Sequence, residues 1–76
     1  MPVITYNSVE NALTEEQKEQ LIQALTNAVG DVLGNKIKAN AWVILNESPE
    51  GNFAIGGNPI TANMLKSMQK KQGEPS

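Results

Sequence analysis

Residues 41–45 read Ala-Trp-Val-Ile-Leu, a nearly continuous apolar run of the length of one β-strand. Such a run is typical of a strand that is covered on both faces, as in a parallel sheet. Upstream of this run, Thr14-Glu15-Glu16-Gln17 forms a capping box, with acidic residues in the first turn, and predicts that a helix begins there. Gly34 is the expected C-cap of that helix.

The predicted helix has an apolar stripe, because apolar residues recur at helical spacing along it. The stripe contains Leu21, Leu25, Ala28, Val29 and Val32, and is widened by Ile22 and Leu33. Ahead of the helix, residues 2–8 are rich in β-branched and aromatic types, which predicts a first strand. Strand, helix and strand in this order indicate a βαβ unit with two parallel strands and a right-handed crossover.

The remaining chain is predicted to form short elements. A turn at residues 48–52 leads into a hairpin arm at residues 53–57, whose glycines permit positive φ, and Asn58-Pro59 is expected to break the chain again. Thr61 is a candidate cap for a short helix that carries Ala62, Leu65 and Met68. From about Gln69 the sequence is polar, which predicts a frayed tail. Without an internal repeat or a linker, residues 1–76 are expected to form a single domain.

The composition points to an oligomer. The 76 residues are 39% hydrophobic and include one Trp, one Tyr and one Phe, which is little material for a hydrophobic core within one chain. Cysteine and histidine are absent, which excludes disulfides and the usual zinc sites, so neither a metal nor a cofactor is expected. A two-stranded sheet also has edges and a face that must be covered. Association with other chains is the remaining means of stabilisation.

The charge pattern and the hydropathy exclude two kinds of partner. The net charge is −2, and the six basic residues are all lysines, three of them near the C-terminal end, so a nucleic-acid-binding face is not expected. No apolar run is long enough to span a membrane, and the start of the chain does not have the pattern of a signal peptide. A soluble, cytoplasmic protein is therefore expected.

Five features in a fixed order resemble the 4-oxalocrotonate tautomerase family of the tautomerase superfamily, whose members use an amino-terminal proline. They are Met1-Pro2, the first strand, the Thr-Glu-Glu-Gln-Lys helix start, the second strand and Phe53-Ala54-Ile55-Gly56-Gly57. The resemblance covers about residues 1–57. It implies the α/β tautomerase (MIF-like) fold: a short β-α-β protomer with a parallel two-stranded core and a C-terminal hairpin, assembled as an oligomer. In this family the oligomer is a hexamer, a trimer of dimers.

The resemblance implies an isomerase that catalyses 1,3-keto-enol proton transfer on a small enol or 2-oxo acid. Removal of Met1 by methionine aminopeptidase would give Pro2 a free secondary amine. The pKa of an α-amino group is ordinarily about 7.7–8.0, and desolvation in an apolar pocket lowers it. A neutral amine can act as a general base or form an iminium. Phe53 matches the position of a family aromatic that keeps this pocket apolar; a place at a subunit interface is compatible with that role.

The chain departs from the family at two positions. Members that act on dicarboxylate enols carry one arginine just before the helix cap and one in the second strand. Here Leu13, with Asn11 beside it, stands at the first position and Trp42 at the second, so bidentate capture of carboxylates is lost. Candidate substrate contacts, besides the catalytic Pro2, are Phe53, Trp42, Asn11, Leu13, Asn40 and Lys38. A core or interface role for Trp42 is the competing interpretation.

Three explanations for the missing arginines remain open. The substrate is a neutral or monoacidic enol, with Trp42 as a wall of the pocket. Alternatively, an arginine-bearing paralogue completes a hetero-oligomer, in which this chain supplies Pro2 or only structure. Finally, the reaction is a proline-dependent hydration or dehalogenation, although Ile55 stands where dehalogenating relatives carry a glutamate. A non-catalytic role also stays open, because an attached Met1 makes the Pro2 nitrogen an amide.

Overall fold

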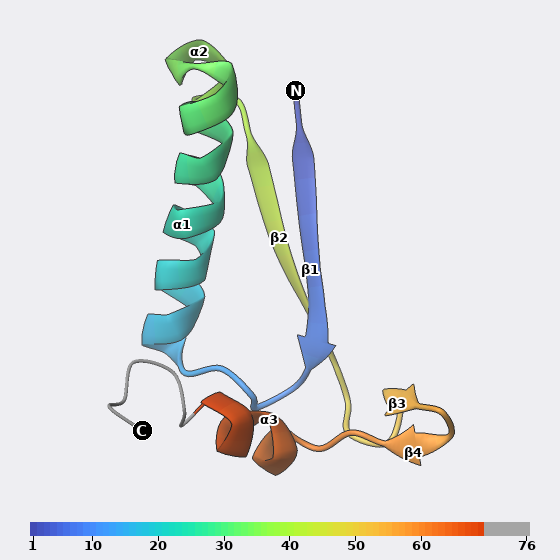
Figure 1. Cartoon of the computed structure of the whole chain (residues 1–76). Helices are drawn as coiled ribbons and strands as arrows, with labels where there is room; N and C mark the ends of the chain where they lie inside the picture. Colours follow the sequence, from blue (N-terminus) through green and yellow to red (C-terminus); the bar gives the residue numbers. More distant parts are fainter. Residues whose placement is uncertain (70–76) are drawn as a thin grey trace. The chain divides into compact units, whose positions relative to one another are not determined.

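The computed structural model describes residues 1–69, and the predicted polar tail beyond them lies outside the described residues. Figure 1 shows the order of elements along the chain. They are β1 (Val3–Val9), α1 (Glu15–Leu33), α2 (Asn35–Lys38), β2 (Trp42–Ser48), β3 (Ala54–Ile55), β4 (Asn58–Pro59) and α3 (Ala62–Gln69). The chain divides into two compact units, and the expectation of a single domain stays a prediction. The first unit contains Met1–Tyr6 and Thr14–Asn46, and the second contains Asn7–Leu13 and the described residues from Glu47 on.

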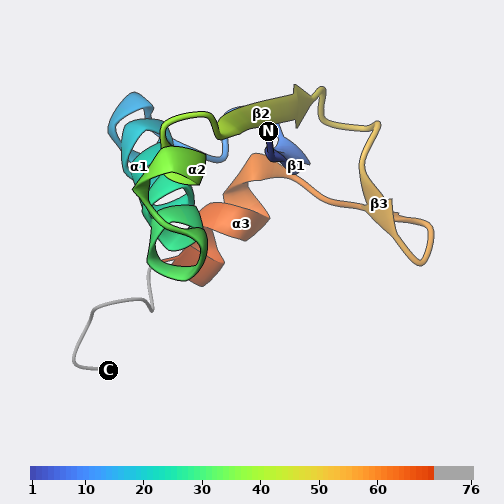
Figure 2. The ribbon, with the colours of Figure 1, turned by 90° about the horizontal axis from the view of Figure 1, so that it is seen from above.

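β1 and β2 form a two-stranded sheet. At one end, the backbone N–H of Trp42 donates to the carbonyl oxygen of Pro2 at 2.9 Å, and at the other the N–H of Glu10 donates to the carbonyl of Ser48 at 2.7 Å. Both strands advance in the same direction between these bonds, so they are parallel, and Figure 2 shows them side by side. The predicted β-α-β unit is confirmed.

The caps of α1 lie where the sequence predicts them. The Thr14 hydroxyl accepts from the Gln17 N–H at 3.0 Å, and the Gln17 side-chain oxygen accepts from the Thr14 N–H, also at 3.0 Å. These two bonds satisfy donors that no helical carbonyl can reach. At the other end, Gly34 is the C-cap, and its N–H donates to the Gly30 carbonyl at 2.9 Å.

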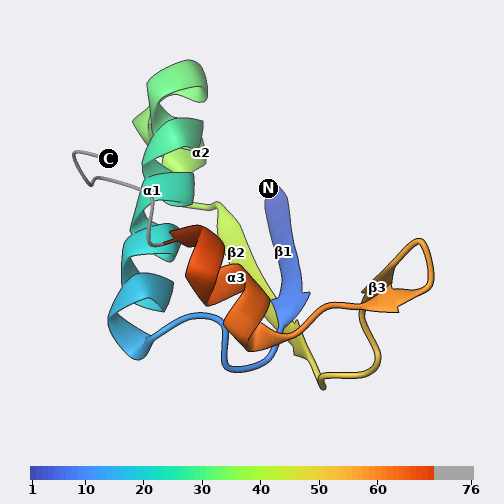
Figure 3. The ribbon, with the colours of Figure 1, turned by 60° about the horizontal axis from the view of Figure 1, so that its bottom comes forward.

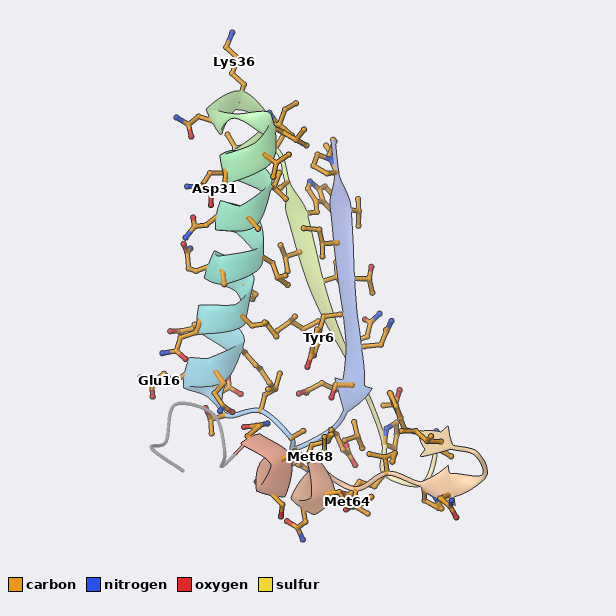
Figure 4. The ribbon with its side chains drawn as sticks, viewed as in Figure 1. Tyr6, Glu16, Asp31, Lys36, Met64 and Met68 are labelled. Atoms are coloured by element: carbon orange, nitrogen blue, oxygen red, sulfur yellow. The ribbon has the colours of Figure 1, made fainter. Side chains whose placement is uncertain are left out.

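The apolar stripe of α1 is only partly covered. Leu21, Leu25 and Val29 are half-buried, whereas several other predicted members are exposed, Val32 as much as 80%. The exposed members are Ile22, Ala28, Val32 and Leu33. In Figure 4, Glu16 and Asp31 point from the outer side of α1, away from the strands of the same unit. Two strands are too narrow to cover a stripe of this width, so part of it remains exposed.

One face of the sheet in the first unit is open. Val43 and Leu45 are half-buried, but the alternating residues Trp42 and Ile44 are 55% and 40% exposed. The bond between Trp42 and Pro2 places Val3, 56% exposed, beside Trp42 on the same face. The predicted cover on both faces is thus not supplied within residues 1–69 of one chain, and the expectation that other chains supply it stays a prediction. The continuous apolar run requires a cover that residues 1–69 of one chain do not supply.

α2 is an element that the sequence did not predict. It follows α1 directly, because Gly34 both ends α1 and precedes Asn35. The side-chain nitrogen of Asn40 donates to the carbonyl oxygen of Lys36 at 2.9 Å, which satisfies one carbonyl at the end of this single turn. The chain then enters β2.

The core of the second unit is a small cluster at the end of β1. Val9, Ala12 and Ala62 are buried, and Phe53 and Leu65 pack against them. The side-chain nitrogen of Gln69 donates to the Ala12 carbonyl at 3.0 Å, which ties the end of α3 to the same cluster.

A β-hairpin with a two-residue loop follows β2. β3 and β4 pair antiparallel, with Ala54 opposite Pro59 and Ile55 opposite Asn58. Gly56 and Gly57 have φ of 58° and 85°, and positive φ at both central residues is the requirement of a type I′ turn. The predicted arm is confirmed, and Figure 3 shows that it extends away from α3 of the same unit. The break predicted at Asn58-Pro59 is wrong, because a short edge strand has no need of the N–H that proline lacks.

α3 is capped from two places in the chain. The Thr61 hydroxyl accepts from the Met64 N–H at 3.2 Å, as predicted, and a Glu50 carboxylate oxygen accepts from the Ala62 N–H at 2.8 Å. Ala62 and Leu65 face the core, but Met68 is exposed, so it lies outside the cluster that the helix covers. Among the described residues, no helix is both long and apolar enough to cross a bilayer.

Candidate active site

Pro2 lies at the head of β1, where the chain enters the sheet. It is half-buried, and its carbonyl oxygen is held by the N–H of Trp42 at 2.9 Å. This bond fixes the backbone of the residue that carries the candidate base. While Met1 is attached, the Pro2 nitrogen is a tertiary amide with no basic lone pair, so Pro2 could act as a base only after Met1 is removed.

Three further candidates lie in the same unit as Pro2. Trp42 presents an exposed indole on the open sheet face, on the strand that pairs with the head of β1. Lys38 ends α2 and is half-buried. Asn40 is exposed, and its amide nitrogen already donates to the Lys36 carbonyl, which gives the side chain a structural task. Figure 1 shows α2 and the amino terminus at the same end of this unit.

The other candidates belong to the second unit. Phe53 packs against Val9, Ala12 and Ala62, and its carbonyl accepts from the Ile60 N–H at 2.8 Å. Asn11 is exposed in the turn after β1, with a positive φ of 68°, and Leu13 is half-buried next to the cap of α1. The ring of Phe53 therefore has a core contact in addition to any contact with substrate.

The charges of these candidates are few. Lys38 is the only ionisable side chain among them. Within residues 1–69, no group of three acidic side chains is placed to hold a metal ion. Lys38 is therefore the one side chain in this set that can pair with an anion through its charge.

Sequence reasoning missed two structural residues, one in each unit. Gly30, in the interior of α1, lies under the side chain of Lys38, and Glu50 caps α3. A glycine inside a helical pattern is a signal that could have been followed, because glycine is a poor helix former and its presence there usually has a packing reason. The pairing of Glu50 with Ala62 spans a turn and a hairpin and has no local signature.

Comparison with known proteins identifies the class. The family model described as "Tautomerase enzyme" matches residues 2–63. The probable tautomerase K2 of Dickeya dadantii (strain 3937) is 38% identical over 61 residues, which are 80% of this chain and 90% of that relative. The β-α-β unit with its C-terminal hairpin is thus a tautomerase fold, and the chain belongs to the tautomerase family.

Solved structures agree with this assignment. DmpI from Helicobacter pylori is 33% identical and superposes with a TM-score of 0.66, over 76% of this chain and 94% of that one. A 4-oxalocrotonate tautomerase isozyme from Methylibium petroleiphilum is 30% identical with a TM-score of 0.66, over 88% and 98% of the two chains. Membership of this family supports a tautomerase-like role for the chain.

Proposed function

We propose that this protein is a keto-enol tautomerase in which Pro2, after removal of Met1, is the general base. One observation carries the proposal most directly: the match to the tautomerase family begins at residue 2, and that residue is half-buried with its carbonyl held by β2. A base that moves a proton between two atoms of one substrate has to be held in a fixed position beside both. The head of a paired strand supplies such support.

The chemistry follows from the properties of a secondary amine. In its neutral form, the Pro2 nitrogen removes the proton of the enol hydroxyl as the C–O bond becomes a carbonyl, and the ammonium so formed returns a proton to the carbon next to that carbonyl. In the reverse direction, the amine takes the proton from that carbon and the carbonyl oxygen is protonated. Burial against apolar groups lowers the pKa of an amine because it disfavours the charged form, so an apolar pocket keeps more of the base active at neutral pH. Phe53 and Trp42 are the aromatic side chains that we assign to such a pocket.

The substrate that we propose is a small enol or 2-oxo acid with no more than one carboxylate. Bidentate binding of the two carboxylates of a dicarboxylate would require two guanidinium groups, and the chain contains no arginine. The exposed indole of Trp42 instead offers a flat apolar surface. Asn11, Leu13 and Asn40 are proposed as minor contacts at the edges of the pocket.

The working form that we propose is a cytoplasmic homo-oligomer, a hexamer built as a trimer of dimers. The open face formed by Val3, Trp42 and Ile44 is apolar, and burial of such surface is the main driving force of subunit association. Association would also bring candidate residues of different chains together, and it would cover the face that the single chain leaves open.

A second candidate is a subunit of a hetero-oligomeric tautomerase. The absence of arginine favours it, because a paralogous subunit would then supply the carboxylate-binding side chains. A hydratase or dehalogenase is less well supported, since such chemistry needs a carboxylate to activate water and Ile55 occupies the position concerned.

The test combines intact mass with activity. The purified protein is examined by mass spectrometry for loss of Met1, and ketonisation of phenylenolpyruvate and of 2-hydroxymuconate is then followed for the wild type and Pro2→Ala. We expect turnover of phenylenolpyruvate at least about a hundredfold faster than in Pro2→Ala, because general base catalysis contributes about 10²–10⁴-fold. A fully processed wild type that is inactive on both enols would contradict the homo-oligomeric tautomerase and direct the search to an arginine-bearing partner.

A further inference from the structure

Gly30 occupies an unusual position for a glycine, in the interior of α1 (Glu15–Leu33). Glycine destabilises a helix interior relative to alanine, so a glycine there calls for a structural reason. No turn or reversal occurs at this position. The reason must therefore lie in what the absent side chain makes room for.

The space beside Gly30 is filled by Lys38. A Cβ atom built on Gly30 would lie 2.6 Å from Cδ of Lys38 and 3.2 Å from both Cβ and Cγ of the same side chain. Real Cβ contacts are essentially never as short as the first of these distances. The aliphatic stem of Lys38 thus lies directly on the backbone of α1, where any other residue at position 30 would displace it.

This contact distinguishes Lys38 from its neighbours. Within residues 31–40, Lys38 is the only residue that is not exposed. Lys36, on the same short helix, is exposed, and Figure 4 shows its side chain extending away from the end of the helix. Packing of the stem removes much of the rotational freedom that a surface lysine retains.

The ammonium of Lys38 has no partner in the described part of the chain. Lys18, also half-buried, differs in this respect, because it forms an ion pair with Glu15 at 3.4 Å. The ammonium of a lysine whose stem is fixed and which has no ion-pair partner is suited to bind an anion from outside the chain.

Lys38 also lies at the end of the unit where Pro2 enters the sheet. The carbonyl of Lys38 accepts from the Ala41 N–H at 3.2 Å, and the next residue, Trp42, donates its N–H to Pro2. Figure 1 shows α2 and the amino terminus at this same end. The held cation and the candidate base therefore belong to one region of one unit.

We propose that Lys38 binds the single carboxylate of the substrate and that Gly30 is the positioning residue that holds its stem in place. This inference rests on the proposed tautomerase function. An ammonium is a compact point charge, whereas a guanidinium fork binds a carboxylate through two parallel bonds, so this arrangement fits a monoanionic enol. The proposal also explains why a glycine stands in the interior of α1, where it destabilises the helix.

The test compares four variants with phenylenolpyruvate as substrate. Lys38→Met keeps most of the stem but removes the charge, and Lys38→Arg restores a charge. Gly30→Ala leaves the charge intact and displaces the stem, and Lys36→Met is the matched control on the same helix. The methyl ester of phenylenolpyruvate, which lacks the carboxylate, is assayed in parallel. Binding of phenylpyruvate is measured by calorimetry, so that a readout besides turnover exists.

We expect Lys38→Met to raise KM for phenylenolpyruvate at least about tenfold with kcat little changed, because the lost interaction is made in the ground state as well as in the transition state. Its KM for the ester should not change, and Lys38→Arg should recover most of the loss. Gly30→Ala should raise KM about threefold, less than the loss of the charge itself, while circular dichroism shows an intact helix. Lys36→Met should match the wild type.

An unchanged KM and an unchanged phenylpyruvate affinity in Lys38→Met would overturn the inference, as would equal losses in Lys36→Met. An effect of Lys38→Met with none of Gly30→Ala would remove the positioning role of Gly30. If the wild type does not turn over the enol but binds phenylpyruvate through Lys38, the proposed tautomerase function fails and the anion site stands. If it neither binds nor turns over, both proposals fail.

Discussion

Asn11 is the one non-glycine residue with positive φ among residues 1–69. Its φ of 68° lies in the left-handed region, which asparagine tolerates better than most residues because its short polar side chain can bond locally. Asn11 is also a candidate substrate contact. A structural and a functional role therefore compete at this position, and substitutions can separate them.

We expect Asn11→Ala to lower the free energy of unfolding by about 1 kcal/mol and Asn11→Gly to leave it nearly unchanged, because glycine adopts positive φ without steric cost. Urea denaturation at one fixed protein concentration measures the difference, since an oligomer's stability depends on concentration. If the amide contacts substrate, KM should rise equally in both variants. Equal stability of the two variants would contradict the structural role.

At the scale of elements, the helices are defined by their ends. Thr14 and Gln17 exchange two bonds of 3.0 Å at the start of α1, and these bonds need only residues three apart. The start of α3 differs, because one of its two caps is the carboxylate of Glu50, twelve residues from Ala62. The local cap could be predicted from the sequence, and the distant one could not.

Thr14→Ala is expected to lower the free energy of unfolding by about 1 kcal/mol, because it leaves the Gln17 N–H without an acceptor. Thr26→Ala is the matched control. The Thr26 hydroxyl donates to the Ile22 carbonyl at 2.8 Å within the same helix, and alanine there has the higher helix propensity, so its effect should stay within about 0.5 kcal/mol. Far-UV circular dichroism during urea denaturation measures both. Similar losses in the two variants would show that the capping box contributes little.

At the scale of the whole molecule, the dominant feature is apolar surface that the described residues of one chain do not cover. Val3, Trp42 and Ile44 expose one face of the sheet in the first unit. The apolar run at residues 41–45 is therefore better explained by the proposed assembly than by the environment of the strand in one chain. A residue such as Trp42 can serve both as an interface residue and as a wall of a pocket between subunits.

Ile44→Glu is expected to shift the protein from the proposed oligomer to smaller species, because it places a charge where the proposed contact would bury apolar surface. Gln23→Glu adds the same charge on α1, one heptad after Glu16, which points away from the strands in Figure 4, and should leave the oligomer intact. Light scattering coupled to size-exclusion chromatography measures the mass of each. An Ile44→Glu protein that retains the full mass would contradict the assignment of this face to subunit contact.

The sequence determined the features that depend on near neighbours along the chain. Three of these features require only residues a few positions apart, so they can be predicted from the sequence. They are the capping box at Thr14, the C-cap at Gly34 and the turn at Gly56-Gly57. The β-α-β order and the family resemblance could also be predicted from the sequence, since both depend on the order of elements and motifs along the chain. The position of Pro2 directly before β1 and that of Trp42 at the start of β2 agree with that order.

Only the tertiary structure decided which surfaces are covered and which side chains meet. It left one face of β2 open, paired Asn58–Pro59 as β4, brought Glu50 to the start of α3 and laid the stem of Lys38 on Gly30. Each of these depends on residues that are brought together by packing, and their spacing along the chain carries no periodic signal. Composition and periodicity indicate that an apolar side chain will be buried or that a polar one will be paired. Which residues bury it or pair with it is determined by the packing of the chain.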